Sequence, residues 1–127
     1  MRPNELTREI IGGAIEVHKV LGPGLLESCY EECLCYELSQ RNINFKRQLA
    51  LPVAYKGMKL SCGYRIDILA EDLVVIELKA VNKTTKIDEA QLMTYLRLGN
   101  WPIGLLINFT VEVLKDGIIR RVNNFKE

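Results

Sequence analysis

The feature that most constrains this chain is residues 74–80 (VVIELKA), where an acid and a base interrupt its most apolar strand-like stretch. The branched apolar residues predict a buried β-strand. Burying Glu77 or Lys79 is costly unless the charge is paired or holds a metal ion. The fold must therefore bury one side of this strand and give the two charged side chains partners or solvent on the other.

The preceding segment, YRIDILA, predicts the partner strand of a hairpin that bends near Asp72. A symmetrical bend places Asp67 opposite Glu77, and Arg65 opposite Lys79. Because side chains alternate along a strand, these four side chains are expected to share one face. The other face is then expected to be apolar, made of Ile66, Ile68, Val74, Ile76 and Leu78.

The polar face of this hairpin has two interpretations. Facing carboxylates repel, and a divalent cation between Asp67 and Glu77 would remove the repulsion, with oxygen ligands that suit Mg²⁺ or Mn²⁺. Lys79 would then lie beside the metal and orient a water or stabilise negative charge. Alternatively, Arg65 and Lys79 neutralise the two acids in a surface lattice of ion pairs. The hairpin alone leaves both interpretations open.

The rest of the chain predicts an α/β fold. Apolar residues at helical spacing predict helices over about residues 6–21 and 25–40, separated by the breaker GPG. Period-two alternation then predicts three strands, with a turn at Lys56-Gly57. A third helix with a capping box, a buried strand and a short C-terminal hairpin with an Asp-Gly turn follow. This order predicts a single domain over residues 1–127, with a mixed β-sheet flanked by helices.

Composition limits the partners. The net charge is +1 and the pI is near 7.6, so contact with nucleic acid needs a local basic patch. The residues available for such a patch are Lys46, Arg47, Lys56, Lys59, Lys83 and Lys86. Neither a bilayer-spanning apolar run nor the apolar core of a signal peptide is found, so we expect no membrane partner and a cytoplasmic location. Cys29 and Cys33 share a helix face, but reduced, packed cysteines are favoured over a zinc site.

Several motifs occur in a familiar order. Gly24, Glu27 and Tyr30 fit a G-x-x-E-x-x-Y pattern, which is accompanied by VHKVLGPG, YRIDIL, IELKA, EAQLMTYL and GLLINF. Over roughly residues 6–122 the chain resembles the small bacterial and archaeal GxxExxY proteins of the PD-(D/E)XK nuclease superfamily. The proline of the superfamily's motif is Ile66 here. Asp88 stands where many relatives carry histidine.

The resemblance implies a restriction-endonuclease-like core and a metal-dependent nuclease that acts on nucleic acid, with DNA favoured over RNA. It implies that Asp67 and Glu77 are ligands of Mg²⁺ or Mn²⁺, that Glu27 supports the metal or its waters, and that Lys79 is the catalytic lysine. Gln91 and Tyr95, four residues apart on one helix, resemble a further catalytic element. Arg65 and Tyr30 are expected to support the site. The alternatives are an inactive binding protein with the same fold, and a homodimeric assembly subunit.

Overall fold

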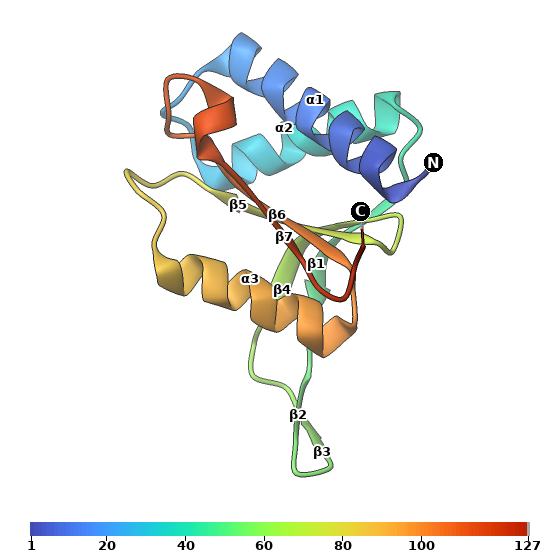
Figure 1. The fold of residues 1–127 in the computed structure, drawn as a ribbon. Helices are drawn as coiled ribbons and strands as arrows, with labels where there is room; N and C mark the ends of the chain where they lie inside the picture. The colour runs from blue at the N-terminus through green and yellow to red at the C-terminus, as the bar shows by residue number, and fades with distance from the viewer. Residues whose placement is uncertain (127) are drawn as a thin grey trace.

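A computed structural model describes residues 1–126 and shows a central sheet between helices (Figure 1). The helices are α1 (Pro3–Leu21), α2 (Glu27–Gln40), α3 (Lys86–Gly99) and the short 3₁₀ helix η1 (Leu114–Gly117). The strands are β1 (Phe45–Ala50), β2 (Val53–Tyr55), β3 (Met58–Leu60), β4 (Arg65–Ala70), β5 (Val74–Lys79), β6 (Ile103–Asn108) and β7 (Ile118–Val122). This architecture confirms the predicted α/β class.

The main sheet has the order β1-β4-β5-β6-β7. β5 and β6 are parallel because α3 carries the chain back between them, and the other neighbours are antiparallel. The mixed sheet is therefore as predicted. The β4–β5 register, which pairs Ile68 with Ile76 and Ala70 with Val74, is the symmetrical one expected for a bend at Asp72.

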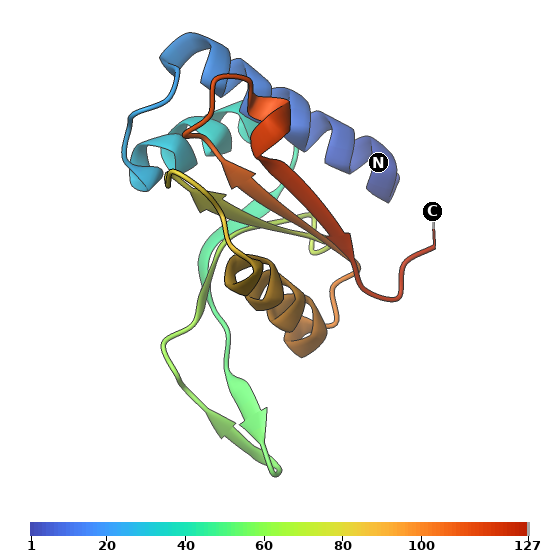
Figure 2. The same cartoon turned by 60° about the vertical axis from the view of Figure 1, so that its left-hand side comes forward.

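Helices cover both faces of the sheet. α1 and α2 lie on one face and α3 on the other (Figures 1 and 2). The helical spacing of Leu6, Ile10, Ala14 and Val17 places all four in the larger core cluster. A second cluster forms between α3 and the opposite face. Both faces of β4 and β5 therefore lose most of their contact with water.

This two-sided burial corrects the prediction of one polar and one apolar face. Val75 shares the face of Glu77, yet it is buried with Leu69 beneath α3. Ile66 packs into this second cluster too, and not with Ile68 as predicted. The paired residues of β4 and β5 end at Ile68 and Ile76, and the β1 strand beside β4 is irregular at Gln48, whose φ is 49°. Apart from the turn at Glu71 and Asp72, the hairpin is polar only at the end that carries Arg65, Asp67, Glu77 and Lys79.

The predicted C-terminal hairpin is wrong. Its Asp-Gly turn lies within η1, and β7 pairs with β6 at the edge of the main sheet. The reason is packing. Leu114 enters the core, and Gly117 lies so close to the backbone oxygen of Asn108 that an added Cβ would meet it at 2.2 Å.

The strands before α3 also differ in number from the prediction. Three of them, β1, β4 and β5, join the main sheet as expected, whereas β2 and β3 form a separate two-stranded hairpin around Lys56-Gly57. Within residues 1–126, no helix combines the length and the apolar character needed to cross a bilayer.

Candidate active site

A polar cavity of about 350 Å³ opens at the end of β4 and β5, between the start of α2 and the side of α3. Seven of the eight residues singled out from the sequence line it: Glu27, Arg65, Asp67, Glu77, Lys79, Gln91 and Tyr95. They come from the β4–β5 hairpin and from two helices, α2 before it and α3 after it in the sequence. The fold therefore brings together the set that the motifs suggested.

Asp67 and Glu77 are held against each other by the backbone. The amide of Asp67 donates to Oε2 of Glu77 at 3.2 Å, and the amide of Leu78 donates to Oδ2 of Asp67 at 2.8 Å. Each carboxylate thus accepts a hydrogen bond from the neighbouring strand. These two bonds fix the pair in the polar cavity, on the face predicted from the register.

Glu77 is the more buried of the two acids. Only 9% of the residue is exposed. Burial, followed by repulsion from the Asp67 carboxylate, raises the pKa of Glu77 to about 9. The nearby cation of Lys79 opposes the shift of this pKa but does not cancel it. Without a cation between the two acids, Glu77 therefore holds a proton at neutral pH.

The raised pKa predicts a pH-dependent stability. Between its ordinary pKa near 4.5 and about 9, Glu77 binds a proton when folded and releases it when unfolded. The free energy of unfolding should therefore fall as pH rises through this window, by at most about 1.4 kcal/mol per pH unit. We expect the variant Glu77→Gln to show a flatter decline than wild type. Urea unfolding in a chelator from pH 5 to 9 measures both slopes, and parallel slopes would contradict the assignment.

The cations of the site do not neutralise this pair. Among residues 1–126, no ion pair within 4.0 Å includes Asp67, Glu77 or Arg65. Lys79 Nζ lies 4.0 Å from Oδ1 of Asp88, and Arg65 donates weakly to the backbone oxygen of Gln48 at 3.4 Å. The geometry disfavours the ion-pair lattice and leaves two adjacent acids without a cationic partner.

Gln91 and Tyr95 reach the cavity from α3, on one side of that helix as their spacing predicted. Tyr95 is buried, and the exposed ring of Tyr64 meets it edge-on with centroids 5.9 Å apart. Burial, with a smaller contribution from Glu77, raises the pKa of Tyr95 to about 12. Its phenol therefore stays protonated and able to donate a hydrogen bond.

A comparison with family models decides the broader identity. The model described as the PD-(D/E)XK nuclease superfamily matches residues 4–122. The chain belongs to this superfamily. No curated protein and no solved structure gave a significant match. The matched range includes all the residues that line the polar cavity.

Glu27 reaches the polar cavity from the first residue of α2 and is exposed. The turn before it requires glycine at Gly24, whose φ of 104° is unfavourable for other residues. Tyr30, the eighth sequence candidate, does not line the cavity. Its hydroxyl instead donates to the Gly22 oxygen at 2.6 Å and accepts from the Leu25 amide at 3.1 Å. Tyr30 therefore supports the site by fixing the turn that carries Glu27.

Removal of this hydroxyl should loosen the turn. Tyr30 is fully buried and stacks on Phe109 at 4.2 Å between centroids, so Tyr30→Phe keeps the packing and leaves two backbone groups without their partner. We expect a loss of about 1–2 kcal/mol in unfolding free energy. Urea denaturation measures it, with Tyr36→Phe, an exposed tyrosine on the same helix, as the control. Equal stabilities for the two variants would show that the bonds do not hold the turn.

A chain of hydrogen-bonded polar side chains leads away from Asp67, and the sequence did not predict it. Gln48 Nε2 donates to Asp67 Oδ1 at 3.3 Å and to Glu31 Oε1 at 2.7 Å. Glu31 is buried and accepts two bonds from Arg47, at 2.8 and 3.1 Å. Glu31 follows Glu27 by one helical turn, a signal that could have been read. Gln48 has φ of 49° within a strand, and no local pattern predicts that backbone conformation.

Nucleases of this superfamily typically use divalent metal ions. Among residues 1–126, no three His, Cys, Asp or Glu side chains lie close enough together to hold a metal ion directly. Two adjacent carboxylates, one of them protonated for want of a cation, nevertheless fit Mg²⁺, which commonly binds one or two carboxylates and keeps several waters. The donor set therefore fits a metal that takes Asp67 and Glu77 as its two protein ligands.

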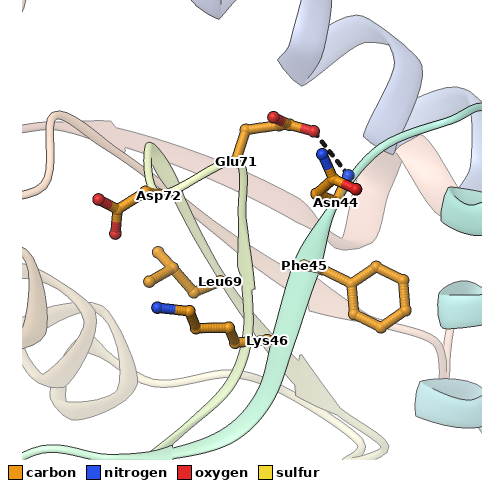
Figure 3. A pocket seen from close by; sticks show the side chains of 6 residues that line it. All are labelled: Asn44, Phe45, Lys46, Leu69, Glu71 and Asp72. Carbon is orange, nitrogen blue, oxygen red and sulfur yellow. Dashed lines mark hydrogen bonds between the residues drawn. The ribbon is translucent and has the colours of Figure 1, made fainter.

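A second cavity of about 310 Å³ lies at the opposite end of the hairpin, around the β4–β5 turn (Figure 3). Its acids are Glu71, which accepts a hydrogen bond from the Asn44 amide at 2.6 Å, and Asp72, which the indole of Trp101 contacts at 3.4 Å. Lys46 lines this cavity beside the two acids, so it differs from the first cavity in having a lysine next to its acids and none of the residues singled out from the sequence as site candidates.

Proposed function

We propose that this protein is a metal-dependent nuclease that hydrolyses phosphodiester bonds, with DNA favoured over RNA. The observation that carries the proposal is the Asp67–Glu77 pair, which lies in a polar cavity beside Lys79 and has no cationic side chain as a partner. A pair kept in this costly state suggests a bound Mg²⁺ or Mn²⁺.

Each of the seven sequence candidates that line the cavity has a role in this mechanism. Asp67 and Glu77 would hold the metal, which supplies Lewis-acid stabilisation of the phosphoryl oxygens when bound. Protonated Lys79 donates hydrogen bonds to the negative charge that develops on the phosphate. Glu27 orients the attacking water. Gln91 and the phenol of Tyr95 donate to substrate oxygens, and Arg65, at the exposed rim, attracts the phosphate backbone.

Finer assignments rest on the motifs. We propose that the protein is a prokaryotic GxxExxY protein, because Gly24, Glu27 and Tyr30 occupy the turn and helix that carry an acid into the cavity. We also propose a homodimer, because β1 and β7 are edge strands with unpaired backbone groups. Sedimentation over a range of concentrations tests the dimer, and a strict monomer throughout would contradict it.

The second candidate function is a binding protein that keeps the fold without turnover. The near-neutral net charge favours it, because affinity for phosphates normally needs many Lys and Arg residues. A protein that only binds nucleic acid has no evident need for the unneutralised Asp67–Glu77 pair. We therefore rank the binding function second.

A cleavage assay separates the two functions. Labelled single- and double-stranded DNA and single-stranded RNA are incubated with the protein in Mg²⁺, Mn²⁺ or EDTA. We expect cleavage with either metal and none in EDTA. Folded protein that shows no heat of Mn²⁺ binding and cuts no substrate would favour the binding protein.

A further inference from the structure

The β2–β3 hairpin, residues 53–60, stands away from the body of the protein (Figures 1 and 2). β2 and β3 pair only with each other, and Tyr55 and Met58 are 59% and 64% exposed. An isolated two-stranded hairpin is marginally stable in water and gains little from exposed apolar side chains. The exposed ring of Tyr55 and the exposed thioether of Met58 therefore suit contact with a partner more than they stabilise the fold.

The charge of the arm indicates what that partner is. Residues 38–66 contain six of the chain's seventeen Lys and Arg residues and none of its sixteen Asp and Glu residues. Arg41 and Arg47 are paired with glutamates of the helices, whereas Lys56 and Lys59 are exposed and form no ion pair within 4.0 Å among residues 1–126. A near-neutral protein thus presents a purely basic arm, which is complementary to a polyanion.

The arm leads directly into the catalytic cavity. The chain that returns from β3 passes through Gly63, Tyr64 and Arg65, all of which line that cavity. Tyr64 is 42% exposed and touches the buried Tyr95 of the site. An extended ligand on the arm would therefore reach the acid pair without crossing another element.

We propose that this arm binds a single-stranded segment of nucleic acid and guides it into the active site, a proposal that rests on the proposed nuclease function. Exposed aromatic rings stack on bases that are free of a duplex, and they do so with little sequence preference. The Nζ atom of Lys56 lies 5.4 Å from the centroid of the Tyr55 ring. The tip of the arm therefore offers both a stacking surface and a phosphate contact. Tyr64 supplies the second stacking surface at the cavity entrance.

The preference for single strands follows from the number of charges. Duplex binding depends mainly on many phosphate contacts, and this arm offers only Lys56, Lys59 and the nearby Arg65. Stacking on bases makes up for few charges only when the bases are exposed. The same chemistry serves single-stranded DNA and RNA, so both belong in the test.

The test is binding in EDTA, where cleavage is not required. Fluorescence anisotropy measures the affinity of the full chain for labelled dT20, for U20 and for a 20-base-pair duplex. We expect either single strand to bind at least about tenfold more tightly than the duplex, and Tyr55→Ala to weaken single-strand binding by about fivefold or more. Tyr55→Phe should restore binding, because stacking needs the ring and not the hydroxyl.

Charge reversal on and off the arm provides the matched control. Lys59→Glu should weaken single-strand binding by about tenfold, whereas Lys115→Glu, an equal change on η1, should alter it little. Equal losses in the two variants, tighter binding of the duplex, or no effect of Tyr55→Ala would overturn the proposal. If Tyr55→Ala instead loses self-association in sedimentation while its single-strand binding is unchanged, the arm makes a contact between copies of the protein.

The arm's role and the nuclease function can fail separately. If the arm variants leave metal-dependent cleavage and single-strand binding unchanged, the protein is a nuclease but the arm does not bind the substrate. If single strands bind through the arm but no metal supports cleavage, the arm binds nucleic acid and the protein is not a nuclease.

Discussion

Asp67→Asn should abolish cleavage without weakening the fold. The change removes one of the two carboxylates that we expect to hold the metal, so Mn²⁺ affinity and activity should fall together, the activity to the level seen in EDTA. Asparagine keeps an oxygen that can accept the Leu78 amide bond and removes the charge that raises the pKa of Glu77. The free energy of unfolding in a chelator at pH 8 should therefore stay equal or rise by about 1 kcal/mol.

Three measurements on the same samples check this result: calorimetric Mn²⁺ titration, cleavage of single- and double-stranded DNA, and urea unfolding. Asp116→Asn, an identical change at an exposed position in η1, is the control and should alter none of them. An Asp67→Asn protein that binds Mn²⁺ as wild type does would show that the acid pair is not a metal site. A large loss of stability would show that the pair contributes to the fold instead.

Lys79→Ala should separate metal binding from catalysis. A protonated lysine cannot be a metal ligand, so its removal should leave Mn²⁺ affinity equal or slightly higher through relief of repulsion. Cleavage should fall by about a hundredfold or more, the scale seen when one donor to a developing oxyanion is removed. Single-turnover cleavage beside Mn²⁺ titration gives both quantities.

The contact of Lys79 with Asp88 offers a rival explanation for such a loss. Asp88 belongs to the capping box of α3, where its side chain accepts from the Thr85 amide at 2.9 Å. Asp88→Asn keeps an acceptor for the cap and removes the charge that faces Lys79. If Lys79 acts on the phosphate, Asp88→Asn should retain most of the activity. Equal losses in the two variants would show that Lys79 acts by positioning α3.

Much of the site followed from the sequence because its parts are local. The bend at Asp72 fixes the β4–β5 register, and that register determines that Asp67 and Glu77 meet. Helical spacing likewise placed Gln91 and Tyr95 on the same side of α3. Chain geometry alone produces these relations, so a pattern of a few residues predicts them.

Partner choice over long sequence distances could not be read in the same way. Arg47 pairs with Glu31 and Glu32 on α2, Lys79 contacts Asp88, and Arg65 forms no ion pair among the described residues. Each of these outcomes depends on how helices dock on the sheet. The sequence supplied four charged side chains on one hairpin, and the docking left its two acids without a cation.

The sequence by itself determined the three helices, the mixed sheet and the acids of the hairpin, because periodicity and turn residues act within a few positions of the chain. Only the tertiary structure decided that β7 joins β6, that Tyr30 fixes the turn before Glu27, and that Gln48 links Asp67 to Glu31. It also decided the burial of Glu77, and with it the pKa near 9, because α3 covers the face that alternation alone had left to solvent. Burial and hydrogen-bond partners depend on contacts between distant segments, and local patterns carry no information about them.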